Sequence, residues 1–107
     1  MLPDAFEYLL PTRILYGAHI IDRLQDEIES FQGARALLVT DRVLVDLGIA
    51  ERVTAALARA QIQVVSVFSE VPPNSTIRCV EDCARQGRLV DCDLVIGLGG
   101  GSVMDTV

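Results

Sequence analysis

The sequence predicts an α/β fold with a mostly parallel sheet flanked by helices and a pair of strands at its N-terminal edge. Three observations carry this prediction. Short runs of branched apolar residues alternate along the chain with stretches of helical periodicity. The two helical stretches between the later strands hold about 10–13 residues each, a length that suits a crossover between parallel strands. Half of the 107 residues are hydrophobic, which is enough for one core.

The N-terminal region predicts two short strands and one helix. Phe6 to Leu10 and Arg13 to Tyr16 are separated by Pro11, which is tolerated at a sheet edge, so we expect an edge strand pair. Hydrophobic residues then recur at helical spacing, at Ile21, Leu24, Ile28 and Phe31. Acidic residues lie mostly on the opposite side, so this pattern predicts an amphipathic helix that ends near Gly33.

The middle of the chain predicts two buried strands with helices between them. Ala36 to Thr40 (ALLVT) is an apolar run of the kind found in strands covered on both faces. We expect a short helix over Arg42 to Leu47, closed by Gly48, and an amphipathic helix over Ile49 to Ala60. Val64 to Phe68 predicts the next buried strand.

The last third of the chain continues the alternation. Pro72 to Thr76 (PPNST) predicts a loop, Ile77 to Arg88 a helix, and Leu94 to Leu98 the last strand. Strands that alternate with helices indicate a Rossmann-like parallel sheet with right-handed crossovers.

Three segments follow the carboxyl ends of the predicted parallel strands. They are Thr40-Asp41, Pro72 to Thr76, and Gly99 to Ser102. Ligands bind outside the carboxyl ends of the strands in such sheets. We therefore expect the functional site where these three segments meet.

Leu94 to Asp105 (LVIGLGGGSVMD) gives the strongest indication of function. A buried strand runs into Gly99 to Gly101, and Ser102 then stands where a helix N-cap would lie, with Asp105 completing a capping-box-like pattern. Glycines let the backbone approach a phosphate without Cβ clashes, and a helix start offers N–H donors and the positive end of a dipole. The pattern favours phosphate binding, and a strand-to-helix turn without a ligand is the alternative.

The glycine loop fits the G-x-G-x-x-G dinucleotide fingerprint only in part. Gly97-x-Gly99-x-x-Ser102 ends in serine. The fingerprint usually follows the first strand, with an acidic residue about 20 positions later, whereas the acidic candidate Asp41 precedes the loop. The spacing alone therefore does not match the standard motif.

Charge and composition exclude several classes of function. Fifteen acidic residues against nine basic ones give a net charge of −6, and the basic residues are all arginines scattered along the chain, which disfavours nucleic acid as a partner. Asp4 and Glu7 replace the basic start of a signal peptide, and no apolar run approaches the roughly 18–20 residues of a membrane span. Three cysteines, an odd number, do not suggest a secreted disulfide framework. We therefore expect a cytoplasmic protein without membrane or nucleic-acid partners.

Cysteine and histidine residues do not predict a metal or catalytic site. Cys79 and Cys83 can share a helix face, but zinc takes four ligands and the sequence offers no suitable fourth. Small buried apolar side chains are therefore the better interpretation of these residues and of Cys92. His19 is the only histidine and cannot form a triad without partners, so we expect a surface or capping role.

Four segments resemble the amino-terminal domain of the iron-containing (group III) alcohol dehydrogenases. They are PTRILYG at 11–17, LLVTD at 37–41, PPNST at 72–76 and CDLVIGLGGGSVMDT at 92–106. The GGGSxxD motif in this register is specific to a superfamily that also includes glycerol dehydrogenase and dehydroquinate synthase. The resemblance covers essentially all 107 residues but only about the first quarter of a family enzyme. We therefore expect residues 1–107 to be a truncated N-terminal NAD-binding domain, with the helical metal-binding domain outside this chain.

The resemblance implies a set of cofactor-binding residues. The glycine–serine loop would hold the pyrophosphate of a nicotinamide dinucleotide, with Asp105 beside the cofactor. Asp41 would lie near the adenine ribose, where a carboxylate accepts hydroxyl hydrogen bonds and repels a 2′-phosphate, so NAD is favoured over NADP. A helix or turn cap is the structural alternative for Asp41. Asn74 matches a loop asparagine near the cofactor, in a loop that has Ser75 where the family usually has proline. The full set is Asp41, Asn74, Gly99, Gly100, Gly101, Ser102 and Asp105.

The resemblance further implies the cofactor-binding portion of an NAD-dependent, metal-assisted alcohol/aldehyde oxidoreductase. Its metal ligands, one Asp and three His, belong to the later helical domain, so we expect no catalytic or metal-binding residue here, and an Fe or Zn ion only in that domain. The expected substrate is a small alcohol or aldehyde, and a homo-oligomer is a further possible assembly. This chain alone is not expected to be active. The alternatives are a stand-alone nucleotide-binding module and a dehydroquinate-synthase-like lyase.

Overall fold

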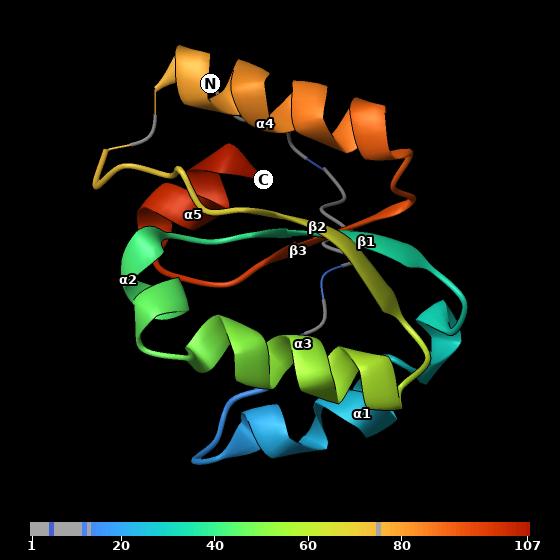
Figure 1. The fold of residues 1–107 in the computed structure, drawn as a ribbon. Coiled ribbons are helices and arrows are strands. Elements are labelled where there is room, and N and C mark those ends of the chain that lie inside the picture. The colour runs from blue at the N-terminus through green and yellow to red at the C-terminus, as the bar shows by residue number, and fades with distance from the viewer. Residues whose placement is uncertain (1–4, 6–11, 13, 75) are drawn as a thin grey trace.

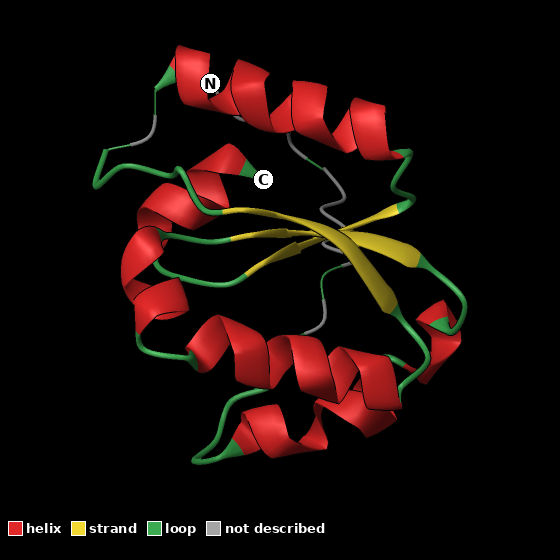
Figure 2. Ribbon diagram, in the orientation of Figure 1, coloured by secondary structure: helices red, strands yellow, loops and turns green. Residues whose placement is uncertain are grey.

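The computed structural model describes residues 5, 12, 14–74 and 76–107 of the chain. Three parallel strands form one sheet in the order β2-β1-β3, with helices on both faces (Figures 1 and 2). The elements are η1 (Ile20–Arg23), α1 (Leu24–Glu27), η2 (Glu29–Phe31), β1 (Arg35–Val39), α2 (Arg42–Asp46), α3 (Ile49–Arg59), β2 (Gln63–Phe68), α4 (Ile77–Val90), β3 (Leu94–Gly97) and α5 (Gly101–Thr106), where η marks a 3-10 helix. The predicted α/β fold with a parallel sheet between helices is confirmed.

β1 is the central strand and is buried on both faces. Its side chains from Ala36 to Val39 are at most 1% exposed. Because alternate side chains of a strand point to opposite faces, Leu37 and Val39 enter one apolar cluster and Ala36 enters another. A central parallel strand needs apolar residues on both faces, which accounts for the unbroken ALLVT run.

The two crossovers place their helices on opposite faces of the sheet. α2 and α3 lead from β1 to β2 on one face, and α4 leads back across β1 to β3 on the other (Figure 1). α5, which follows β3, lies on the α4 face (Figure 1). The chain therefore leaves the neighbouring strands β1 and β3 toward opposite sides, and this arrangement opens a crevice at their carboxyl ends.

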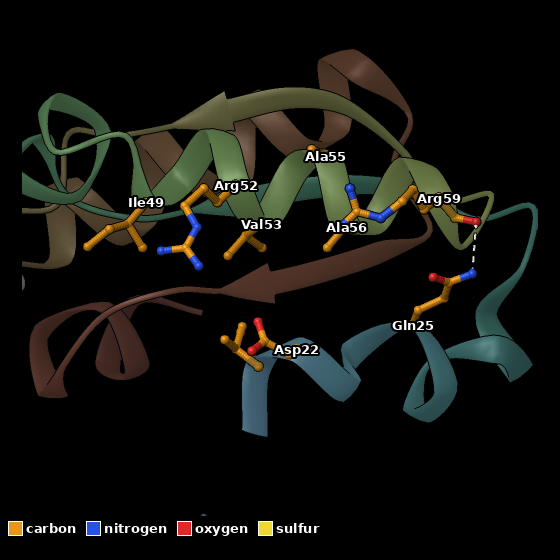
Figure 3. A pocket seen from close by; sticks show the side chains of 9 residues that line it. Asp22, Gln25, Ile49, Arg52, Val53, Ala55, Ala56 and Arg59 are labelled. Carbon is orange, nitrogen blue, oxygen red and sulfur yellow. Dashed lines mark hydrogen bonds between the residues drawn. The ribbon is translucent and has the colours of Figure 1, made fainter. Parts of the chain in front are cut away.

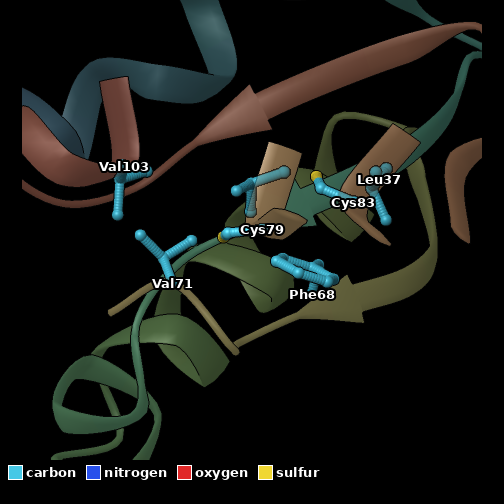
Figure 4. Packing of buried hydrophobic residues seen from close by; sticks show 7 residues of the cluster. Leu37, Phe68, Val71, Cys79, Cys83 and Val103 are labelled. Carbon is cyan, nitrogen blue, oxygen red and sulfur yellow. The ribbon is translucent and has the colours of Figure 1, made fainter. Parts of the chain in front are cut away.

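The face under α4 and α5 contains the cysteines and the first residues of the last helix. Figure 4 shows Cys79 and Cys83 of α4 beside Phe68, with Val71 and Val103 pointing toward one another. Cys79, Cys83 and Cys92 are free thiols. Burial, and then the neighbouring thiols, raise the pKa of Cys83, so this side chain stays protonated at neutral pH. Cys79 and Cys83 therefore act as small buried apolar side chains, as expected, while Cys92 is half-buried.

The opposite face is covered by α3. Leu57 is fully buried there and packs with Val53, Ala36 and Ile62. Val53 and Leu57 lie one helical turn apart on α3, Ala36 lies on β1, and Ile62 directly precedes β2. α3 therefore contributes an apolar stripe to the core.

Removing the Leu57 side chain tests this packing. We expect Leu57→Ala to lower the free energy of unfolding by about 2–5 kcal/mol, because the truncation leaves a cavity under α3. Urea denaturation followed by circular dichroism measures the change. The matched control is Leu47→Ala, since Leu47 is 67% exposed and its truncation should change the free energy of unfolding by about 0.5 kcal/mol or less. Equal urea midpoints for the two variants would contradict the buried position of Leu57.

The segment predicted as one amphipathic helix is divided, and this prediction is wrong. It consists of η1, the four-residue α1 and η2, with Ile28 out of helical conformation at φ −109° and ψ 13°. Leu24 and Ile28 pack against the α3 face of the core, whereas Ile21 and Phe31 remain 45% and 48% exposed. Only the middle turn is anchored by packing, and the flanking turns are 3-10, as is frequent at helix ends.

The predicted N-terminal strand pair falls largely outside the described residues. Phe6 to Leu10 is not described, and Ile14 to Tyr16, the described part of the second strand, form no strand. Ile14 is 78% exposed and Tyr16 fully exposed. A strand requires a neighbour for its backbone groups, and these residues pair with none of the three described strands. The predicted strands and helices from Ala36 onward are otherwise confirmed to within two residues at each end.

Candidate functional site

The three strand ends are joined by hydrogen bonds beyond the last paired residues of the sheet. The Thr40 amide donates to the Phe68 carbonyl at 2.8 Å, and the Leu98 amide donates to the Val39 carbonyl at 2.9 Å. The hydroxyl of Thr40, a fully buried residue, donates to the Leu98 carbonyl at 2.8 Å. The segment that enters the glycine loop is thus fixed to the end of β1.

A hollow of about 320 Å³ opens at this edge of the sheet. Four of the seven predicted residues, Asp41, Gly100, Gly101 and Ser102, line it. The other lining residues are Arg42, Val43, Val71, Pro72, Pro73 and Val103. Segments that follow all three strands therefore meet around one hollow, at the place where the topology predicts a ligand site.

The three glycines of the loop differ in what the fold demands of them. Gly99 has φ +153°, and a Cβ there would lie 2.6 Å from Cγ2 of Val103, so packing alone requires glycine. A Cβ at Gly100 or Gly101 would meet no atom within 4 Å, and the φ of −93° at Gly100 is open to any residue. The fold thus explains Gly99, whereas the bare backbone at Gly100 and Gly101 faces open space in which another molecule can approach closely.

The two carboxylate oxygens of Asp41 have different neighbours. One oxygen, Oδ1, accepts a hydrogen bond of 2.9 Å from the Leu44 amide, so Asp41 is the N-cap of α2. The other, Oδ2, lies 3.6 Å from the Cβ position of Gly99. The capping role that was the structural alternative is therefore present, and it leaves the second oxygen beside the glycine loop.

Ser102 does not occupy the predicted N-cap position. The N-cap of α5 is Gly100, whose side-chain-free backbone is extended, and the helix begins at Gly101. Ser102 lies in the first turn, and its hydroxyl donates to the Pro73 carbonyl. The predicted capping box with Asp105 is therefore wrong, because the helix starts within the glycines, two residues earlier than the pattern suggested.

Asn74, Gly99 and Asp105 do not line the hollow, although each adjoins a residue or segment that does. Asn74 is exposed and directly follows Pro73, and Asp105 is exposed on α5. Sequence analysis missed Arg42, which lines the rim and forms a 2.8 Å ion pair with Glu70. Its position directly after Asp41, at the first residue of α2, was the available signal.

A larger hollow of about 430 Å³ runs along α3 on the other face of the sheet. Figure 3 shows Arg52 and Arg59 on α3, with Asp22 and Gln25 across from them; the Gln25 side-chain amide donates to the Arg59 carbonyl at 3.5 Å. Both arginines are exposed to solvent. None of the predicted site residues lines this hollow, so the candidate site is the one at the strand ends.

The described residues offer little for other chemistry. Within residues 14–74 and 76–107, together with residues 5 and 12, no group of three or more His, Cys, Asp and Glu side chains is placed to hold a metal ion. His19 is exposed, so the surface role among its two predicted alternatives is confirmed. It stands at the N-cap position of η1 with φ 56°, and its side chain makes no capping hydrogen bond there. Among the described helices, none combines the length and the apolar character that crossing a membrane demands.

Comparisons with known proteins agree on one family. The model of the family described as "Iron-containing alcohol dehydrogenase" matches residues 11–107. The chain is 38% identical over 98 residues to 4-hydroxybutyrate dehydrogenase from Cupriavidus necator, an alignment that covers 92% of this chain and 24% of the relative.

Solved structures give the same result. Sulfoacetaldehyde reductase from Bifidobacterium kashiwanohense, determined in complex with NAD+, superposes with a TM-score of 0.80 at 29% identity, covering 95% of this chain and 26% of that one. A 1,3-propanediol oxidoreductase superposes with a TM-score of 0.82 at 32% identity and the same coverage. The chain thus spans about a quarter of the length of these relatives. The chain belongs to the iron-containing alcohol dehydrogenase family.

Proposed function

We propose that this chain is the NAD-binding portion of an alcohol dehydrogenase, with the hollow at the strand ends as the cofactor site. The observation that carries the proposal is the open space beside Gly100 and Gly101, which the packing of the fold does not require. The NAD+ complex of a relative of the same fold supports the choice of cofactor.

In this proposal the glycine loop and Asp41 bind different parts of the dinucleotide. The backbone of Gly100 and Gly101, with Ser102 next to it, faces the pyrophosphate, where the absence of Cβ atoms permits close contact. Oδ2 of Asp41 accepts a hydrogen bond from a ribose hydroxyl, while the bond from Leu44 to Oδ1 holds the carboxylate in place. In the proposal Asn74 approaches the cofactor from the loop that contains Pro73, and Asp105 approaches it from α5. When bound, NAD supplies the hydride acceptor, and the residues of this chain bind and orient it.

The residues that the structure describes include no group of side chains that fits a metal ion. We propose that the Fe or Zn ion and the residues that act on the alcohol or aldehyde belong to a later domain of a longer enzyme, for which residues 1–107 supply the cofactor domain. The relatives reported above are dehydrogenases or reductases by name, which favours this chemistry over a dehydroquinate-synthase-like lyase.

Titration of NADH with the 107-residue chain tests the proposal. We expect saturable enhancement of NADH fluorescence, reversed by an excess of NAD+. Circular dichroism of the same sample establishes that the chain is folded. A folded chain that leaves NADH fluorescence unchanged at every protein concentration would refute the cofactor site.

Replacing Asp41 tests the preference between the two cofactors. We expect Asp41→Gly to lower the NAD-over-NADP affinity ratio by about tenfold, because the carboxylate that repels a 2′-phosphate is gone. Asp41→Asn is the matched variant, since its side-chain oxygen can still cap α2 while the charge is lost. Dissociation constants for NADH and NADPH give the ratio. If both variants retain the wild-type ratio, Asp41 has no part in the choice of cofactor.

A further inference from the structure

We infer that Ser102 is a positioning residue, whose hydroxyl holds the loop from Ser69 to Asn74 against the glycine loop, rather than a side-chain ligand of the phosphate. This inference rests on the proposed function, because it concerns how the two walls of the same hollow are held. Pro72 and Pro73 form one wall, and Gly100 and Gly101 form the other.

The hydrogen-bond chemistry of Ser102 supports this role. A serine hydroxyl carries one proton, and that of Ser102 is donated to the Pro73 carbonyl. An ionised phosphate has only acceptor oxygens, so it needs this same proton. Ser102 can therefore bind a phosphate through its side chain only by releasing Pro73. The main-chain amides of the glycine loop remain the natural phosphate donors.

The loop from Ser69 to Asn74 needs such a connection. Pro72 and Pro73 lack N–H groups, so this stretch can join a neighbour through its carbonyls but not through amide donors at those two positions. Two residues before Pro73, Val71 is 6% exposed and packs toward Val103 (Figure 4). The loop is thus held by an apolar contact at Val71 and by the hydrogen bond from the Ser102 hydroxyl at Pro73.

The glycine loop is itself anchored at both ends, so it can serve as the fixed partner. Thr40 holds Leu98 at one end. At the other end Val103, the residue after Ser102, is 1% exposed and packs in the cluster under α4. Ser102 therefore connects an anchored segment to a loop that approaches it from 29 residues away.

Hydrogen exchange on the ligand-free chain separates the two roles of Ser102. In Ser102→Ala we expect the amide of Val71, a residue only 6% exposed, to exchange about fivefold faster, the factor by which losing one typical hydrogen bond shifts a local opening equilibrium. Ser102→Thr, which keeps a hydroxyl, should restore the wild-type rate. Thr54→Ala is the control, because it removes a hydroxyl that donates to Ala50 on α3, on the other face of the sheet, and should leave this loop unchanged.

NADH titration of the same variants completes the test. We expect Ser102→Ala to weaken NADH binding by about fivefold to tenfold, with Ser102→Thr close to wild type and thermal midpoints nearly equal. Weaker binding with unchanged loop exchange would overturn the inference, since it would identify a direct ligand. Faster exchange with unchanged NADH affinity would also overturn it, since the loop would then not position the cofactor. If the wild-type chain binds no NADH, the proposed function fails, and the exchange rates still decide whether Ser102 joins the two loops.

Discussion

Replacing Gly99 with alanine is expected to lower the free energy of unfolding by about 2–5 kcal/mol. Its φ of +153° is one that residues with a Cβ rarely adopt, and the new Cβ would lie 2.6 Å from Cγ2 and 3.1 Å from Cβ of Val103. Val103 is 1% exposed and packed in the cluster under α4, so it cannot retreat without disturbing the core. Urea denaturation followed by circular dichroism measures the loss.

Gly101→Ala is the matched control for this substitution. It lies in the same loop, at the first residue of α5, where a Cβ meets no atom within 4 Å. Alanine also favours the helical conformation, so the free energy of unfolding should change by about 0.5 kcal/mol or less. Coinciding unfolding curves for the two variants would show that the crowding at Gly99 does not exist.

Gly100→Val should weaken NADH binding by about a hundredfold while leaving the urea midpoint close to that of the wild type. The extended backbone at Gly100, with φ −93° and ψ −155°, accepts a β-branched residue, and the Cβ of that residue would meet no atom within 4 Å. The valine would instead project into the hollow and keep the pyrophosphate away from the backbone. Fluorescence titration and urea denaturation of the same preparation separate the two effects.

The control for Gly100→Val carries the same side chain elsewhere. Ala58→Val places a valine on the exposed side of α3 and should bind NADH as the wild type does. Wild-type affinity in Gly100→Val would mean that the dinucleotide does not pass this residue, and the proposed site would have to be abandoned.

The sequence was sufficient for the sheet and for the helices that cross it, because their patterns depend on burial that the topology guarantees. ALLVT is typical of a strand covered on both faces, and α4 keeps Cys79 and Cys83 on one side. The segment from Ile21 to Phe31 shows the limit of such patterns. Periodicity indicates which side chains are apolar, but whether a surface exists to bury them depends on α3. Leu24 and Ile28 pack against its apolar cluster, whereas Ile21 and Phe31 stay 45% and 48% exposed.

The candidate site was predictable in its location but not in its internal bonds. Strand ends placed Asp41 and the glycine loop at one edge, and the structure brings them together. The local pattern could not show which glycine begins α5, and it could not show that the Ser102 hydroxyl would find a carbonyl 29 residues earlier. Hydrogen bonds between distant segments depend on how two loops meet, and no local spacing encodes that meeting.

The strand order has a consequence for when the site comes into existence. The central strand β1 is the earliest of the described strands, and its partner β3 begins at residue 94, so the bond from Thr40 to Leu98 closes a separation of 58 residues. During synthesis β1 can pair with β2 well before β3 emerges, and contacts so distant in sequence form late. A ligand bound across β1 and β3 would recognise the sheet only after β3 has paired with β1, so it would stabilise that pairing by mass action rather than a single loop. Cofactor binding would thereby report that β3 has joined β1.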